Sequence, residues 1–275
     1  MPRVAPAPHG RATVRLPVRA WRAARVGVHV LRGLATTVGV FPFAGEARRR
    51  TLIRRWSAKL LRIVGIHARV DGSLEAAGGN VLIVANHVSW LDIFVVNAHC
   101  PARFVAKSEL SSWPLAGRLM RAAGTIFIAR ERRHDTRRVN DHAAKALAAG
   151  GVVAVFPEGT TTDGSVLLKF HASLLQPIVD SRGRVQPVAI RYVDPTGARS
   201  DAPVYGDETI AASFWRVCGQ RRLIVDVAVP EPIAAHGAHR RELAREAEAV
   251  IRRVLALPAV ATAPGTTGDR AGASP

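Results

Sequence analysis

From about His67 to Leu257, short apolar runs alternate with longer amphipathic runs, and this alternation restricts the folds open to the chain. The apolar runs have the length of strands, and the segments between them are long enough for helices. The predicted strands are 80–85, 103–106, 125–129, 152–156, 185–192 and 223–229. The predicted helices are 90–98, 113–123, 135–149, 209–218 and 240–257. This order predicts an α/β domain with a largely parallel sheet covered by helices, whose ligands bind at the carboxyl ends of the strands.

Positive charge is concentrated in front of this domain. The chain of 275 residues has a formal net charge of +18, and its first 65 residues contain 14 Lys or Arg against the single acid Glu46. Such a block needs an anionic partner, which is either nucleic acid or the surface of an anionic membrane. Charge alone does not choose between the two.

The periodicity of residues 18–65 favours the membrane. On a helical wheel the first half of this segment places its basic side chains in one arc and its apolar side chains in another, and the second half repeats the pattern. The basic arc of the first half holds Arg19, Arg22, Arg25, His29 and Arg32. We therefore predict two membrane-associating helices that lie in the interface, with arginine heads at lipid phosphates. The alternative is a pair of surface helices packed on the protein core.

The remaining boundaries follow from composition. Residues 1–17 are rich in Pro, Ala and Arg and predict a loose basic tail, and residues 258–275 predict a disordered tail. The α/β domain then spans 66–257. Cys100 and Cys218 are far apart and have no metal-type spacing, which favours a reducing compartment and argues against a disulfide or a metal site.

A histidine and an aspartate five residues apart follow the first predicted strand of the domain. Ser89 and Asp92 have the spacing of a capping box, which predicts that a helix begins there. His87 then lies outside the helix, and its ring can fold back toward the Asp92 carboxylate. A carboxylate that accepts the Nδ1–H of a histidine fixes its tautomer, so that Nε2 can act as a general base toward an alcohol. No GxSxG elbow and no cysteine nucleophile is present, which favours direct transfer without a covalent intermediate.

A second motif follows the strand 152–156. Pro157 cannot donate to a sheet ladder, so the strand must end there. Glu158, Gly159 and Thr160 then present a carboxylate, a flexible backbone and a hydroxyl, a set suited to a polyol or a phosphate. The alternative for these residues is an ordinary exposed turn.

Two cations also follow predicted strands. Lys107 and Arg130 each come directly after an apolar run, where they could hold a phosphate. For a single Lys or Arg, the alternative is a solvated surface charge.

In combination and order, four segments resemble the signature blocks of the glycerolipid acyltransferase family, whose type member is 1-acylglycerol-3-phosphate O-acyltransferase. These segments are 86–92, 124–130, 156–160 and 186–190. The resemblance implies an acyltransferase domain over 66–257, in which His87 is the catalytic base and Asp92 orients it. It also implies that the acceptor is bound by Lys107, Arg130, Glu158, Gly159 and Thr160.

The resemblance implies a membrane-associated enzyme that moves a fatty acyl group from acyl-CoA or acyl carrier protein to a lysolipid, without a further cofactor. We expect a monotopic protein on the cytoplasmic face of the inner membrane. Where members acting on lysophosphatidate often have Arg-Ser after the Phe-Pro-Glu-Gly-Thr block, this chain has Thr161 and Thr162, followed by Asp163. This departure resembles the branch that acylates lyso-ornithine lipids. Because Lys107 and Arg130 suit a phosphate, we favour 1-acylglycerol-3-phosphate as the acceptor, giving phosphatidate.

Two alternatives from other classes remain at this point. The basic composition fits a nucleic-acid-binding protein, although no known nucleic-acid motif accompanies it. A membrane adaptor that has kept the fold without the activity is the second alternative, and the intact His87 and Asp92 argue against it.

Overall fold

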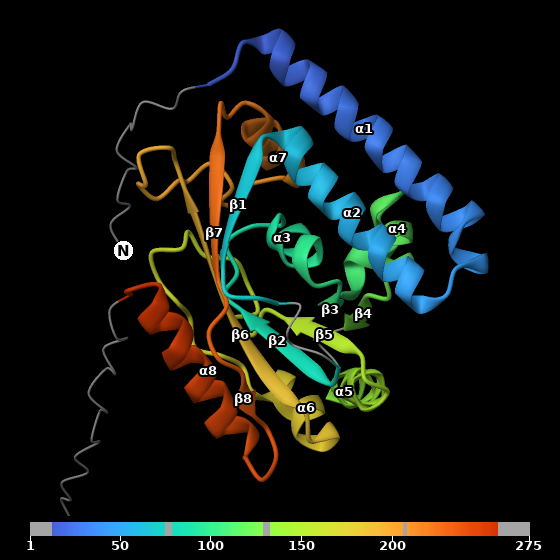
Figure 1. Ribbon diagram of the computed structural model, residues 1–275, viewed down its shortest axis with the longest axis vertical. Coiled ribbons are helices and arrows are strands. Elements are labelled where there is room, and N and C mark those ends of the chain that lie inside the picture. The colour runs from blue at the N-terminus through green and yellow to red at the C-terminus, as the bar shows by residue number, and fades with distance from the viewer. Residues whose placement is uncertain (1–12, 75–78, 129–132, 206–207, 258–275) are drawn as a thin grey trace, which may run out of the picture.

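In the computed structural model, residues 13–74, 79–128, 133–205 and 208–257 are described (Figure 1). Within them, eight strands form one sheet with the order β1-β7-β6-β2-β5-β3-β4, and β8 pairs with β6. The strands are β1 (Ile66–Asp71), β2 (Val81–Ala85), β3 (Arg103–Lys107), β4 (Ile126–Ile128), β5 (Val152–Val155), β6 (Arg184–Val193), β7 (Leu223–Ala228) and β8 (Ile233–Ala234).

The sheet is largely parallel, as predicted. β4, β3, β5, β2 and β6 run parallel to one another, while β7 and β8 are antiparallel to β6. β1, which the sequence pattern did not single out, pairs in parallel with β7. It begins directly after Gly65, whose φ of +83° closes the preceding helix in the left-handed region that glycine adopts without strain.

Helices cover both faces of the sheet (Figure 1). The α-helices are α1 (Leu16–Gly39), α2 (Glu46–Val64), α3 (Asp92–His99), α4 (Ala116–Ala122), α5 (Arg133–Ala148), α6 (Gln176–Ser181), α7 (Ile210–Cys218) and α8 (Arg240–Val254). Short 3-10 helices are η1 (Phe41–Phe43), η3 (Ser108–Ser112) and η4 (Ala172–Leu175). One core joins the sheet to α2, α3 and α7, and the other joins it to α5, α6 and α8.

The predicted helix 113–123 is shorter than expected. Its first residue, Trp113, is the C-cap of η3, and a turn through Pro114 and Leu115 follows, in which Leu115 has a φ of +63°. α4 therefore begins only at Ala116.

The N-terminal helices form a clamped pair. The ring of His29 on α1 stacks on Trp56 of α2, with 4.7 Å between ring centroids. His29 Nε2 donates to the Trp56 carbonyl at 2.9 Å, and Trp56 Nε1 donates to the His29 carbonyl at 3.1 Å. Gly33 permits this approach, because a Cβ at that position would lie 2.6 Å from Trp56 Nε1. The pair is thus held by matched polar contacts as well as by apolar packing.

Part of the basic arc of α1 faces the protein. This corrects the expectation that all of its arginine side chains point to lipid phosphates. Arg19 donates to the Trp215 carbonyl at 2.7 Å, and Arg22 donates to the Gln220 carbonyl at 2.5 Å. His29 is buried, whereas Arg25 and Arg32 are exposed. Only part of the basic arc therefore remains open to an external anion.

The apolar faces of the two helices have different surroundings. On α2 they are used inside the protein, since Leu60, Leu61, Ile63 and Val64 are buried, so that packing on the core is the correct interpretation for this helix. On α1 the apolar face is exposed. Its exposed large side chains are Leu16, Val18, Trp21, Val28, Leu31 and Val38, and Phe43 follows on η1 with 87% of its surface exposed.

At the N-terminus, the ordered chain reaches further than the predicted boundary at residue 18. Thr13 forms a bridge with Gln220, and α1 starts at Leu16 with Pro17 in its first turn. Residues 1–12 of the predicted tail 1–17, and the predicted tail 258–275, lie outside the described residues. No helix in the described ranges is both long and apolar enough to cross a bilayer.

Candidate active site

The motifs found in the sequence meet at one edge of the sheet. β2, β5 and β3 are neighbours and run in the same direction, so their carboxyl ends lie together. His87 follows β2, Glu158 follows β5, and Lys107 ends β3. This is the edge at which ligands bind in open α/β sheets.

His87 and Asp92 form the predicted hydrogen bond. His87 Nδ1 lies 2.8 Å from Asp92 Oδ2. Asp92 is fully buried, while 19% of the His87 side chain is exposed. A carboxylate acceptor places the proton on Nδ1 and leaves the Nε2 lone pair for a reacting group.

Asp92 receives three further hydrogen bonds. The backbone N–H groups of Val88 and Ser89 donate to Oδ2 at 2.8 and 2.9 Å, and the Tyr192 hydroxyl donates to Oδ1 at 2.7 Å. Burial and the Asp92 charge raise the pKa of Tyr192 well above 10.0, so the phenol remains a hydrogen-bond donor. Together these groups replace the water that a buried carboxylate loses.

Tyr192 was not identified from the sequence. It lies two residues beyond the 186–190 segment, and no spacing rule connects it with Asp92, one hundred residues earlier.

The predicted capping box is only half formed. α3 begins at Asp92 and not at Ser89, with Leu91 as its N-cap. The Asp92 carboxylate does reach back to the Ser89 N–H, but Ser89 Oγ accepts from Leu91 N at 3.3 Å. The Asp92 carboxylate thus both accepts from the backbone before α3 and orients the His87 ring.

Glu158 ties the two motif loops together. Its Oε1 accepts from the His87 N–H at 2.8 Å, and its Oε2 accepts from the Leu168 N–H at 2.8 Å. Burial raises the pKa of Glu158 above 4.5, and the two backbone hydrogen bonds act in the opposite direction. Because Glu158 is 4% exposed and both its oxygens already bond to the protein, its position differs from that expected for an acceptor-binding carboxylate.

The turn after β5 also fixes the plane of the His87 ring. Phe156 stacks on that ring at a centroid distance of 4.0 Å and an angle of 9°. Gly159, with φ +76°, donates to the Phe156 carbonyl at 3.1 Å, and Thr162 N donates to the His87 carbonyl at 2.9 Å. The loop of the second motif therefore contacts both the ring and the backbone of His87.

Two further predicted residues, Thr160 and Lys107, lie near this edge. Thr160 and Lys107 are exposed, and within the described part of the chain neither side chain forms a hydrogen bond or an ion pair. Arg130 lies outside the described residues. The described ranges contain no group of three or more His, Cys, Asp or Glu side chains arranged to hold a metal.

Asp163 has a partner that the sequence did not reveal. Arg199, from the loop after β6, lies 3.2 Å from Asp163 Oδ2, and both the N–H and the hydroxyl of Ser165 donate to Oδ1. Burial raises the pKa of Asp163, but the hydrogen bonds from Ser165 and the Arg199 charge outweigh it and hold the pKa below 3.8. The loop that follows Thr160 thus carries an ion pair and not an isolated negative charge.

Comparison with known proteins bears directly on this geometry. A family model described as Acyltransferase matches residues 67–191, which contain both motif loops. A lyso-ornithine lipid O-acyltransferase of Pseudomonas aeruginosa is 40% identical over 207 residues, covering 75% of this chain and 79% of the relative. The chain belongs to the acyltransferase family. The His87–Asp92 pair lies within the residues that the family model matches.

Other relatives of this acyltransferase bear a different acceptor in their names. A 1-acyl-sn-glycerol-3-phosphate acyltransferase of Neisseria meningitidis serogroup B is 35% identical over 236 residues, which cover 86% of this chain and 92% of the relative. The crystal structure of the 1-acyl-sn-glycerophosphate acyltransferase from Thermotoga maritima superposes with a TM-score of 0.68 at 22% identity, over 88% of this chain and 94% of that one. That structure agrees with the fold described above.

Proposed function

We propose that this acyltransferase moves a fatty acyl group from a thioester, acyl-CoA or acyl carrier protein, to the free hydroxyl of 1-acylglycerol-3-phosphate and so forms phosphatidate. The observation that carries the proposal is the hydrogen bond between His87 Nδ1 and a buried Asp92 carboxylate at the ligand-binding edge of the sheet. The relative from Neisseria meningitidis, which matches over nearly its whole length, supports the same reaction.

In the proposed mechanism His87 acts as a general base. Its Nε2 takes the proton of the acceptor hydroxyl while the hydroxyl oxygen attacks the thioester carbonyl carbon. The tetrahedral intermediate then expels the thiolate and becomes the ester. The thiolate takes from the imidazolium the proton that the acceptor hydroxyl gave up. Asp92 stabilises the imidazolium while it exists. A positioned base of this kind contributes about 10²–10⁴-fold in rate.

The acceptor's phosphate is assigned to Lys107 and Arg130. Cations after two strands suit a phosphomonoester through charge-assisted hydrogen bonds. The negative charge of Asp163, part of the departure from the Arg-Ser pattern, would repel a phosphate, but its ion pair with Arg199 weakens that repulsion. A lyso-ornithine lipid is the second candidate acceptor, and the relative from Pseudomonas aeruginosa favours it.

We further propose that the exposed apolar face of α1 lies in the interface of the inner membrane, on the cytoplasmic side. Trp21, Leu31 and Val38 are open to the surroundings, and the exposed Arg25 and Arg32 stand on the same helix. This combination of exposed apolar and basic side chains is typical of interfacial helices. Because the chain belongs to an acyltransferase family with lipid-modifying relatives, we assign anionic membrane lipids, and not nucleic acid, as the partner of the basic N-terminal segment.

The test is thioester release by the purified protein in detergent, with both lysolipids as acceptors. We expect 1-acylglycerol-3-phosphate to be preferred. Arg130→Ala should lower kcat/KM for it by about 10–100-fold, since a hydrogen bond to a charged group contributes about 1.5–3 kcal/mol. A wild type that prefers the ornithine lipid and loses little on this substitution would assign the chain to the second acceptor.

A further inference from the structure

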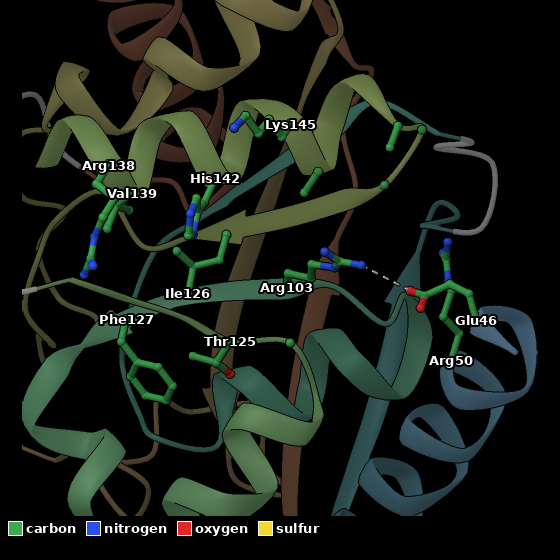
Figure 2. Close-up of a pocket in the computed structure, with 15 residues that line it drawn as sticks. Glu46, Arg50, Arg103, Thr125, Ile126, Phe127, Arg138, Val139, His142 and Lys145 are labelled. Atoms are coloured by element: carbon green, nitrogen blue, oxygen red, sulfur yellow. Dashed lines mark ion pairs between the residues drawn. The ribbon is translucent and has the colours of Figure 1, made fainter. Parts of the chain in front are cut away.

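A groove lined by basic side chains lies apart from the catalytic residues, against the edge strand β4 (Figure 2). Its volume is about 830 Å³. Its walls come from the N-terminal part of α2, the start of β3, and α5. Gly124 and Gly150, which precede β4 and β5, place it toward the amino ends of strands, whereas His87 and Glu158 stand at carboxyl ends.

Three separate elements contribute cations to this groove. Arg50 comes from α2, Arg103 from the first position of β3, and Arg138, His142 and Lys145 from α5 (Figure 2). The lining residues include one acid, Glu46, which lies 3.7 Å from Arg103. Even with His142 neutral, the lining therefore carries four positive charges against one negative.

Most of these cations have no protein partner. Apart from Arg103, the basic side chains of the groove form no hydrogen bond or ion pair with any residue that the structure describes. This differs from Arg19, Arg22 and Arg199, which bond to the protein. Like charges that face one concave space repel one another and raise the local positive potential, which is the condition for binding an anion with several charges.

The shape of the groove limits the size of that anion. Its volume is in the range of about 300–1,000 Å³ that is typical of small-molecule sites. Ile126 of β4 lies near His142 in this lining, whereas the Phe127 ring points away from α5, so that a ligand would find an apolar surface at Ile126 as well as charges (Figure 2). A phosphorylated nucleotide has both parts, a flat base and a set of phosphates.

The position of the groove relates it to the reaction. β4 and β2 are separated by β3 and β5. Three strand spacings amount to about 14 Å across the sheet, and the four or five residues of β5 and β2 add about 13–16 Å along the strands, because the groove lies toward their amino ends and His87 at their carboxyl ends. A ligand with phosphates at one end and a reacting thioester at the other end of a flexible arm satisfies both positions. An acyl-CoA has this form.

We propose that the groove binds the 3′-phosphorylated adenosine diphosphate end of an acyl-CoA, and that Arg138 and Lys145 contribute to its affinity for the phosphates. The inference rests on the proposed function, because that function requires a thioester as the acyl donor. The proposed site implies that the acyl donor is acyl-CoA and not acyl carrier protein.

The experiment measures binding of free coenzyme A, 3′-dephospho-coenzyme A and pantetheine to the full-length protein in neutral detergent by calorimetry. Coenzyme A should bind more tightly than dephospho-coenzyme A, by a factor of about ten or more. Pantetheine should bind most weakly, because it lacks all the phosphates that accept charge-assisted hydrogen bonds. The combined variant R138Q and K145Q should weaken coenzyme A binding by about tenfold or more. The matched control is R137Q, an exposed cation of the same helix that does not line the groove.

Kinetics give an independent readout. The combined variant should raise KM for acyl-CoA and leave kcat and the reaction with acyl-pantetheine unchanged, because the chemistry at His87 is untouched. Equal affinities of the wild type for coenzyme A and pantetheine would overturn the inference. So would a variant that binds coenzyme A normally, an equal loss in R137Q, or a loss confined to acyl carrier protein or to anionic vesicles.

Failure of this inference is distinguishable from failure of the proposed function. Coenzyme A binding that follows the expected pattern, together with acylation of another lysolipid, would contradict the acceptor and retain the groove. Acylation of 1-acylglycerol-3-phosphate by a protein without affinity for coenzyme A would contradict the groove and retain the reaction.

Discussion

The side chain of His87 is held from several directions at once. Asp92 fixes its Nδ1, Phe156 fixes the plane of its ring, and Glu158 bonds to its backbone N–H. Each of these groups is itself held by a strand end or by further hydrogen bonds. A base that is oriented in this way loses little freedom when the acceptor binds, which favours proton transfer.

Replacing His87 with Ala should abolish transfer, with a loss of at least about 10²–10⁴-fold in kcat. The fold should persist, because His87 stands on a loop and is partly exposed. Thioester release and a circular-dichroism melt on the same preparation separate the two effects. Near-normal turnover in His87→Ala would contradict the mechanism.

Asp92→Asn should also be severely impaired, but with a lower Tm, because its amide NH₂ would face buried hydrogen-bond donors.

Tyr192 offers a milder test of the same network. Tyr192→Phe keeps the volume and removes the hydroxyl that donates to Asp92 Oδ1. Since hydrogen bonds to charged groups contribute about 1.5–3 kcal/mol, we expect a lower Tm and a reduction of kcat by about 3–10-fold. KM for the acceptor should change little. A variant that matches the wild type in both Tm and kcat would show that Tyr192 contributes nothing to the position of Asp92.

At the scale of single residues, the sequence predicted which groups meet but not how they are used. The pairing of His87 with Asp92 followed from spacing and from the position of the helix start. The bracing use of Glu158 did not, because its partners, the N–H groups of His87 and Leu168, are backbone atoms that every residue has. The ion pair of Asp163 with Arg199 joins loops that only the fold brings together.

Among the elements, α1 and α2 show how one sequence pattern serves two purposes. Both are amphipathic, yet α2 buries its apolar face against α3 and the sheet, while α1 exposes its own. Periodicity reports that a helix has an apolar face and is silent on what covers it. The inward turn of Arg19 and Arg22 likewise depends on carbonyl groups near α7, far away in the sequence.

The contact between His29 and Trp56 makes the helix pair sensitive to pH. Burial lowers the pKa of His29 below 6.5, and the nearby charges of Lys59 and Arg32 add to this, although the hydrogen bond to Trp56 opposes it. A base with a lowered folded pKa is protonated in the unfolded chain first. Stability is therefore full above pH 6.5 and declines as the pH falls from 6.5 toward the folded pKa.

We expect this decline to be smaller in His29→Gln, which keeps a hydrogen-bond donor and cannot be protonated in this range. Its Tm at pH 8 should be lower than that of the wild type because the ring stack is lost. The measurement is Tm between pH 8 and pH 5 for both proteins. Parallel curves would show that His29 does not contribute to the pH dependence.

For the molecule as a whole, the alternation of strands and helices predicted the fold class because it reports the layers directly. It did not predict β1 or β8. β1 alternates buried and exposed positions only weakly, and β8 has two residues, too few for any period. The order of the strands was also out of reach, because β6 pairs with β2 and β7 through contacts between distant segments.

The face that α1 presents should decide how the whole molecule meets a membrane. Truncation before Ile66 would remove Leu60, Leu61 and Val64 and expose the core that they cover, so substitution on α1 is the better test. The combined change of Trp21, Leu31 and Val38 to Ser should reduce partition to anionic vesicles by tenfold or more. Full burial of one such side chain in an apolar phase is worth about 1.5–3 kcal/mol.

The control for this experiment is Val254→Ser, an exposed apolar residue on α8, across the sheet from α2 (Figure 1). Far-ultraviolet circular dichroism should be the same for all three proteins, because none of the changed side chains is buried. Vesicle binding by the α1 variant at the level of the wild type would place the membrane contact elsewhere on the surface.

The buried bracing of His87 has a consequence for how such an enzyme can change over time. Asp92, Tyr192 and Glu158 hold the reactive ring from inside the fold, while residues 160–166 are exposed or half-exposed. Because Thr162 N donates to the His87 carbonyl, we expect substitutions beyond Thr162 in this loop, and not at Thr162 itself, to change the preferred acceptor while His87 stays in place. We therefore expect that acceptor preference can change separately from reactivity, so that a lineage could exchange one lipid for another in small steps and stay active.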